Sequence, residues 1–93
     1  MFVGILRIEL FLTNGLSLKD KRMRLRSLIE RIKSNFNVSA SEVDEHDKWQ
    51  KAVLGIAFVG NDKAFVNQVL CKIVDFVRSD KNLDIIDYSI EIL

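Results

Sequence analysis

Residues 2–36, FVGILRIELFLTNGLSLKDKRMRLRSLIERIKSNF, change their hydrophobic period once, and this change decides the fold. Over residues 2–12, every even position except Gly4 is apolar. A period of two predicts a strand with one fully buried face. Over residues 25–36, apolar residues recur at three- and four-residue spacing, which is typical of one face of a helix. A strand therefore precedes an amphipathic helix, and the Thr-Asn-Gly sequence at 13–15 separates them.

The boundaries of the other elements follow from similar signals. Ser17, followed three residues later by Asp20, fits a capping box that begins the first helix. A Ser-rich stretch predicts a weak strand near a sheet edge, whereas the sequence KAVLGIAFV is apolar on both faces, as a central strand should be. A Gly-Asn-Asp turn then caps a second helix. The remaining elements are expected as strands over 38–43 and 51–59, a helix with apolar residues from 65 to 77, and a last strand over 84–93.

The resulting order, β-α-β-β-α-β, predicts an α+β protein with the ferredoxin-like fold. In this fold, a four-stranded antiparallel sheet carries two helices on one face. Right-handed crossovers place the first and third strands at the centre of the sheet. No linker or internal repeat divides the chain, so residues 1–93 are expected to form a single domain.

The two faces of the predicted sheet have different surroundings. Alternation along the last strand directs four side chains towards the helices: Ile86, Tyr88, Ile90 and Ile92. The open face is more apolar than a solvated face usually is, with Val3, Ile5, Phe11, Val53, Ala57, Val59 and Ile85 expected there. Such a patch favours a homodimer formed through this face by a two-fold contact. The alternative is that the charged side chains beside the patch hydrate it: Arg7, Glu9, Asp87 and Glu91.

Composition limits the class of protein. With 48% hydrophobic and 29% charged residues, the chain has the balance of a soluble globular protein. No window has the roughly 18–20 apolar residues of a membrane span, so no membrane partner is expected. The N-terminus lacks the basic region and cleavage site of a signal peptide, and the single cysteine, Cys71, excludes an internal disulfide. We therefore expect a cytoplasmic protein.

Charge is distributed unevenly along the chain, although the net charge is only +1. Residues 1–35 carry eight Lys/Arg and three acids, whereas residues 36–93 carry six and ten. Seven of the cations lie between Lys19 and Lys33, and several occupy the first turns of the helix, where the helix dipole disfavours them. A charge placed against the dipole points to a functional reason and to an anionic partner.

The candidate binding residues all belong to this helix. Six cations are candidates for contacts with RNA or another anion: Lys19, Lys21, Arg22, Arg24, Arg26 and Lys33. On a helical wheel, four of them share one flank (Lys19, Arg22, Arg26 and Lys33), while Arg24 and Arg31 lie on the other. A row of Arg and Lys suits phosphate groups. Two alternatives stay open: a solvated helix face, relieved by pairs such as Arg26 with Glu30, or pairing of the cations with the acidic C-terminal part.

Other functions lack the residues that they require. The acidic segment 42–47 matches no Ca²⁺ loop, and His46 alone is a poor zinc ligand and has no nucleophile beside it. We expect no metal, no cofactor and no catalytic activity. RNA stacking on the sheet is also disfavoured, because the third strand has one aromatic residue, Phe58, which should face the helices. Trp49 fits a core or interface position better than a stacking platform.

The block GLSLKDKRMRLRSLIERIKSNFNVSASEVDEHDKWQKAVLGIAFVGND resembles the signature of the YlxP-like proteins, a family of small bacterial proteins of unassigned function. The resemblance rests on S-L-K-[ED]-K-R, on a helix that ends in F-N-V-S, and on an E-V-D…W-Q-x-A stretch that leads into the third strand. Asp20 replaces the commoner Glu. The similarity extends over essentially the whole chain.

The resemblance implies a ferredoxin-like fold without an established activity or cofactor. Genes of this family often lie beside genes for translation initiation and ribosome maturation factors, which implies a role linked to RNA or the ribosome. Lys19, Lys21, Arg22 and Arg26 match the basic motif of the family. The sequence thus favours a non-enzymatic protein that contacts RNA or a ribosomal subunit through its first helix. The alternative is a homodimeric assembly module whose basic helix binds an acidic protein.

Overall fold

A computed structural model describes residues 1–14 and 17–93. The secondary-structure elements are β1 (Phe2–Leu12), α1 (Leu18–Asn35), β2 (Ser39–Asp44), β3 (Lys51–Gly60), α2 (Lys63–Arg78) and β4 (Leu83–Ile92). Their order and nature agree with the sequence prediction, and each observed boundary lies within about one residue of the expected one. Gly15, the last residue of the predicted turn, lies outside the described residues.

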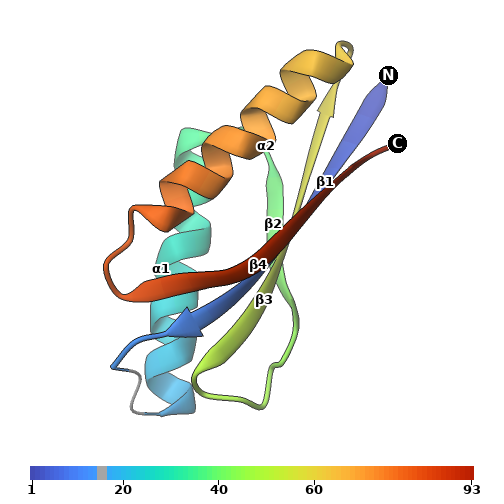
Figure 1. Cartoon of the computed structure of the whole chain (residues 1–93). Coiled ribbons are helices and arrows are strands. Elements are labelled where there is room, and N and C mark those ends of the chain that lie inside the picture. The colour runs from blue at the N-terminus through green and yellow to red at the C-terminus, as the bar shows by residue number, and fades with distance from the viewer. Residues whose placement is uncertain (15–16) are drawn as a thin grey trace.

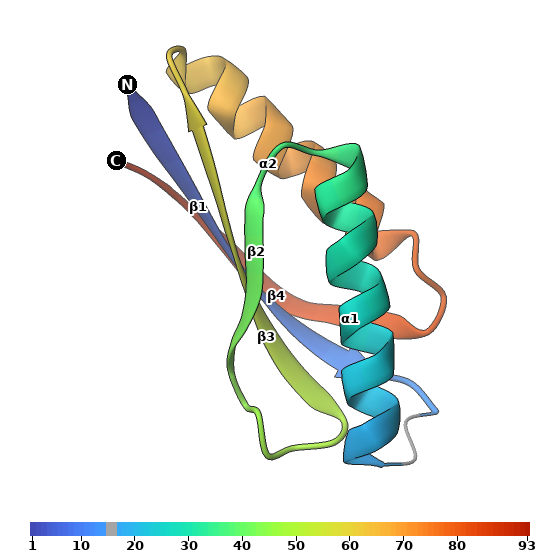
Figure 2. The same ribbon diagram turned by 180° about the vertical axis from the view of Figure 1, so that it is seen from behind.

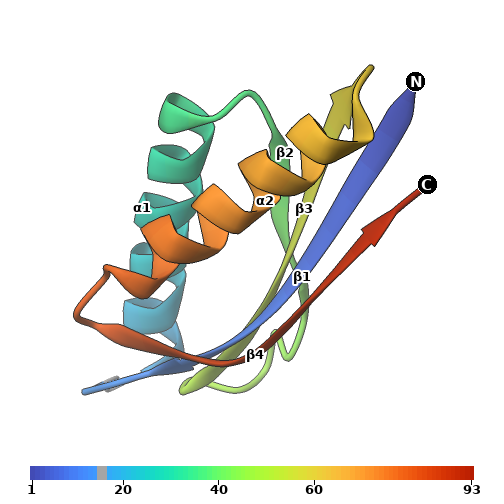
Figure 3. The ribbon, with the colours of Figure 1, turned by 45° about the horizontal axis from the view of Figure 1, so that its top comes forward.

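The four strands form one sheet in the order β2-β3-β1-β4, and each neighbouring pair is antiparallel. Both helices pack on the same face of this sheet and leave the other face open (Figures 1, 2 and 3). This confirms the ferredoxin-like α+β fold, with the first and third strands at the centre. The chain ends lie side by side, since Val3 and Leu93 exchange two backbone hydrogen bonds.

Side-chain caps define where the helices begin. The Ser17 hydroxyl accepts a hydrogen bond from the Asp20 amide at 3.1 Å, and the Asp62 carboxylate accepts one from the Ala64 amide at 3.1 Å. Both caps satisfy amides that have no partner inside the helix. The described part of the chain has no helix that is both long and apolar enough to span a membrane.

The core lies between the sheet and the helices. Four even-numbered side chains of β1 are fully buried and pack against α1 and α2, as the period of two requires: Leu6, Ile8, Leu10 and Leu12. Phe2, at the start of the strand, is partly buried. Gly4 interrupts this row because α2 approaches the strand closely there. A Cβ atom on Gly4 would lie 2.5 Å from Val66 and 2.7 Å from Leu70, so the close approach requires glycine.

A β-bulge in β4 overturns one part of the sequence prediction. Asp87 pairs with Glu9, but the next pair is Leu10 with Ile85, so Ile86 is an extra residue. The extra residue breaks the alternation, so the side chains before Asp87 take the faces opposite to those that unbroken alternation along β4 would give. Ile85 therefore faces the helices and Ile86 lies on the open face with 52% of its surface exposed, which is the reverse of the prediction.

Tyr88 illustrates the effect of an edge strand. It pairs with Ile8 on the helix-covered face, as predicted. Because β4 is the last strand of the sheet, the ring is nevertheless 43% exposed.

Candidate nucleic-acid interface

The seven cations between Lys19 and Lys33 fall into two groups. Three of them pair with carboxylates of the protein: Lys21 with Glu42, Arg24 with Asp20, and Arg31 with Asp80. The other four make no ion pair within residues 1–14 and 17–93: Lys19, Arg22, Arg26 and Lys33. An external anion can therefore bind the second group without breaking an ion pair of the protein.

Lys21 is buried and cannot contact an external phosphate, so its place among the candidate contacts was wrong. Its exposed fraction is 0%, and its ammonium lies 2.9 Å from the Glu42 carboxylate. The ammonium also donates hydrogen bonds of 2.6 Å to the carbonyl oxygens of Glu45 and Lys48. A buried charge needs such a set of partners to offset its lost hydration. Lys21 therefore fastens the loop between β2 and β3 to α1.

The position of Lys21 on the helix carries a signal that the sequence interpretation missed. Lys21, Leu25, Leu28 and Ile32 are the buried residues of α1 and follow one another at spacings of four, three and four. Lys21 thus continues the apolar stripe by one turn. Its partner Glu42 lies 21 residues further along the chain, and no local spacing connects the two.

The acidic segment 42–47 is organised around this lysine. Besides Glu42, the segment contains Glu45, which pairs with Lys48 at 3.0 Å, and His46, whose ring lies 3.2 Å from the Glu42 carbonyl oxygen. The hydrogen bond to Glu45 is the main reason why the pKa of Lys48 is raised. No cluster of three or more His, Cys, Asp or Glu side chains suited to a metal occurs in the described residues. The segment is built of contacts within the protein.

Arg24 is also occupied by internal contacts. Its guanidinium donates hydrogen bonds to the carbonyl oxygens of Thr13 at 2.6 Å and Asn14 at 3.1 Å, and lies 3.2 Å from the Asp20 carboxylate. Asn14 has a left-handed backbone with φ of 56°, which asparagine tolerates well. Arg24 therefore ties the end of β1 to the first turns of α1, and its prediction as a surface contact is not supported by this geometry.

The four unpaired cations form a row along one flank of α1, which we call the cation row: Lys19, Arg22, Arg26 and Lys33. All four side chains are exposed. The row extends for about 21 Å, given the rise of an α-helix. These are the four residues that the helical wheel places together. The expected pair between Arg26 and Glu30 is absent from the ion pairs of the described residues, so no carboxylate among these residues neutralises Arg26.

An open groove runs beside the cation row, between α1 and the edge strand β2. Three of the four cations line it, together with apolar and acidic residues; the lining residues are Arg22, Leu25, Arg26, Ile29, Glu30, Lys33 and Glu42. Figure 2 shows α1 and β2 running next to each other on this side of the molecule. Because Glu42 is neutralised by Lys21, the groove has a positive rim above a partly apolar floor.

Aromatic residues are not arranged for base stacking on the sheet. Phe58 pairs with Gly4 and lies on the helix-covered face, where its ring centroid is 6.1 Å from that of Phe65. This confirms the prediction for Phe58. Trp49 lies in the loop before β3, next to Phe11, and is 43% exposed, so it does not belong to the core.

Comparisons with known proteins agree with this structure. A protein of the bacterium Bacillus subtilis, the uncharacterized protein YlxP, is 32% identical over 77 residues, which cover 83% of this chain and 84% of that protein. The structured domain of Boca from Drosophila melanogaster has a similar fold, with a TM-score of 0.60 and 11% identity over 94% of this chain and 95% of that one. The de novo designed protein Foldit4 matches with a TM-score of 0.54 and 14% identity over 100% and 97%. At such identities the two solved structures share only the fold.

The family comparison covers almost the whole chain. Residues 3–90 match the family described as "Protein of unknown function (DUF503)". Both the basic helix and the segment 42–47 that anchors Lys21 lie inside the match. Together with its similarity to YlxP, this match shows that the chain belongs to the DUF503 family and is a YlxP-like protein.

Proposed function

We propose that this protein is a non-enzymatic RNA-binding protein that contacts the phosphate backbone through the cation row. One observation carries the proposal: four exposed cations share one helix flank, and none is neutralised by a carboxylate of the described residues. Among the described residues, the alternative that the basic residues of α1 pair within the protein holds for Lys21, Arg24 and Arg31. The surplus charge therefore remains for a partner.

The chemistry of the cation row favours a backbone contact over the reading of bases. Arg22 and Arg26 offer planar guanidinium groups that bind phosphate oxygens in bidentate fashion. Phosphate contacts supply affinity and position, whereas sequence is read through base edges or stacked bases. Since Phe11 is the one aromatic side chain that the described strands direct to the open face, we expect RNA binding with little sequence preference.

The partner that we propose is ribosomal RNA, on a ribosomal subunit or its precursor. The protein would then take part in translation or ribosome maturation in the cytoplasm. This step rests on the gene neighbourhood that the YlxP-like resemblance implies. The family itself is of unknown function, so the partner requires a direct test.

Co-sedimentation with ribosomal subunits tests the proposal. The wild-type protein should sediment with subunits at 50 mM KCl and be released at 200 mM, because salt screens phosphate contacts and competes with them. The variant Lys19→Ala/Arg22→Ala/Arg26→Ala should remain in the supernatant at both concentrations. A matched control, Lys63→Ala/Lys72→Ala/Lys81→Ala, removes three exposed charges elsewhere and should behave as the wild type. Sedimentation of the first variant with subunits would refute the proposal.

A second candidate is a homodimeric assembly module that binds an acidic protein segment in the same groove. The observation in its favour is the half-buried Ile29 on the floor of the groove, below the cations Arg22, Arg26 and Lys33. Apolar and charged contacts together are typical of protein interfaces. In this case the triple variant would lose a protein partner in pull-downs from nuclease-treated extract, while its affinity for RNA would equal that of the wild type.

A further inference from the structure

The open face of the sheet exposes two groups of apolar side chains. At the end of the sheet near the chain termini, Val3 of β1 has Val59 of β3 on one side and Leu93, the residue after β4, on the other. Val59 and Leu93 are 57% and 64% exposed. At the other end, Trp49 is exposed next to Phe11, and Ile86 is exposed on β4. Exposed large apolar side chains on a face that no helix covers are typical of an interaction surface (Figure 3).

A charged belt crosses the same face between the two apolar groups. Arg7 lies 2.8 Å from Glu9 and 3.9 Å from Asp44, and Asp87 is the cross-strand neighbour of Glu9. The pKa of the Arg7 guanidinium is raised, first by its hydrogen bond to Glu9 and further by the charges of Asp44 and Asp87. A single cation in the belt thus faces three carboxylates.

The strands carry more acidic than basic side chains on the open face. Cross-strand partners share a face, so the pairs Phe11 with Asp84 and Ile5 with Glu91 add two more carboxylates. The strands then direct five carboxylates to this side against two cations: Glu9, Asp44, Asp84, Asp87 and Glu91 against Arg7 and Lys51. Five negative and two positive groups leave a surplus of three negative charges.

This charge pattern distinguishes between the possible occupants of the face. A second copy, packed face to face about a two-fold axis, would bring two acidic surfaces together, which repel each other. A cationic segment with apolar side chains complements both the belt and the exposed apolar groups. We propose that the open face of the sheet binds a cationic, amphipathic segment of another protein.

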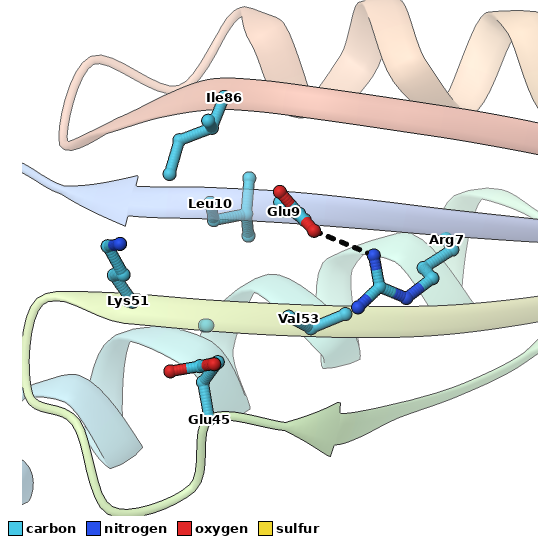
Figure 4. A pocket seen from close by; sticks show the side chains of 8 residues that line it. Arg7, Glu9, Leu10, Glu45, Lys51, Val53 and Ile86 are labelled. Carbon is cyan, nitrogen blue, oxygen red and sulfur yellow. Dashed lines mark hydrogen bonds and ion pairs between the residues drawn. The ribbon is translucent and has the colours of Figure 1, made fainter.

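A small pocket on this face provides a place for one apolar side chain of that segment. It has a volume of about 180 Å³ and lies between β1, β3 and β4. Figure 4 shows Val53 and Ile86 on opposite sides of it, with the Arg7–Glu9 ion pair at one end and Lys51 at the other. An engineered apolar cavity of ~150 Å³ holds a benzene molecule, so the pocket has the size of an aromatic or branched side chain. The carboxylates at the rim of the pocket favour cationic residues on either side of this apolar side chain.

Methyl NMR with a defined peptide tests the proposal. The probe is a synthetic peptide of alternating lysine and leucine, and a peptide of alternating glutamate and leucine is the control probe. Three isoleucine methyl groups report on the two surfaces: Ile5 and Ile86 on the open face, and Ile29 in the groove beside the cation row. The lysine peptide should shift the signals of Ile5 and Ile86 and leave Ile29 unchanged. Shifts at Ile29 alone, or no shift at all, would overturn the proposal.

A pair of matched variants tests the role of charge. Asp84 and Glu91 are exposed and make no ion pair in the described residues, so Asp84→Lys/Glu91→Lys should leave the fold intact. This variant should weaken binding of the lysine peptide at least tenfold. Glu30→Lys/Asn67→Lys/Gln68→Lys makes the same change in net charge at exposed residues on the helix side, and it should change the affinity less than twofold. Equal losses in both variants would contradict a specific surface.

Two further measurements distinguish a protein-binding face from RNA binding and from self-association. The proposal is independent of RNA binding, so the cation-row variant Arg22→Ala/Arg26→Ala should bind the lysine peptide as the wild type does. Sedimentation equilibrium should show a monomer across the concentrations used for NMR. A dimer that is abolished by Ile86→Ser would assign the face to a second copy and overturn the proposal.

Discussion

Neighbouring lysine and arginine residues of α1 have different roles because of their positions on the helix. Lys19 and Arg22 are exposed and make no ion pair with the described residues, whereas Lys21 lies between them in sequence and is fully buried. Successive residues of a helix are rotated by about 100°. The rotation places Lys21 on the stripe of Leu25 and Leu28, where its long side chain reaches the loop between β2 and β3.

Removal of the Lys21 ammonium should destabilise the protein strongly. In Lys21→Met, the Glu42 carboxylate and two carbonyl oxygens lose their partner, and breaking a buried ion pair in this way costs about 3–5 kcal/mol. Urea unfolding, followed by the fluorescence of the single tryptophan Trp49, measures the free energy of unfolding. The expected loss is about 3 kcal/mol, at the lower end because the Glu42 side chain is 18% exposed.

Two variants serve as controls for this experiment. Arg22→Met makes the same chemical change at the next residue, which is exposed, and should alter the free energy of unfolding by less than about 0.5 kcal/mol. In Lys21→Met/Glu42→Met no carboxylate is left unpaired, so part of the stability should return. Equal effects of Lys21→Met and Arg22→Met would show that Lys21 has no structural role.

Helix α1 combines a favourable cap with an unfavourable charge. Ser17 caps the helix and Asp20 supplies a carboxylate in the first turn, but Lys19 places a positive charge at the same end. The helix dipole favours negative groups there. A sequence selected only for stability would not need Lys19, and the cation row gives a reason for its presence.

Exchange of this charge should raise stability and lower RNA affinity at the same time. Lys19→Glu replaces an exposed cation by a first-turn carboxylate, which should stabilise the helix by about 0.3–1 kcal/mol at low salt. Thermal unfolding measures the gain, and fluorescence anisotropy with a labelled single-stranded RNA measures the loss of affinity. Unchanged RNA affinity, or a lower melting temperature, would contradict the role that we propose for Lys19.

The elements also show how far the sequence predicts the structure. The switch from period two to helical spacing predicted β1 and α1, and the helical wheel predicted the cation row. The sequence did not predict that Ile85 and Ile86 exchange faces. A bulge depends on how β4 pairs with β1, and the spacing of apolar residues along β4 does not show it. Burial of Lys21 was predictable from the stripe, but its partner Glu42 was not, since only the tertiary fold brings α1 next to β2.

The whole molecule has two surfaces of opposite charge. The cation row lies on the helical layer, and the charged belt around Arg7 lies on the open face of the sheet. These charges nearly cancel, so the net charge of +1 hides them. Because the surfaces lie on different sides, an RNA and a cationic protein could be bound together. The variant Lys19→Ala/Arg22→Ala/Arg26→Ala should therefore lower the affinity for RNA only. The variant Asp84→Lys/Glu91→Lys should lower the affinity for the lysine peptide only.

The salt dependence of RNA affinity is the most direct test of the cation row. If four phosphates are neutralised on single-stranded RNA, the log–log slope should be about −2.8, so affinity should fall about 50-fold between 50 and 200 mM KCl. The variant Lys19→Ala/Arg22→Ala/Arg26→Ala leaves one contact, and its affinity should fall only about threefold over the same range. A wild-type slope near zero, or equal slopes for the two proteins, would contradict RNA binding through this helix.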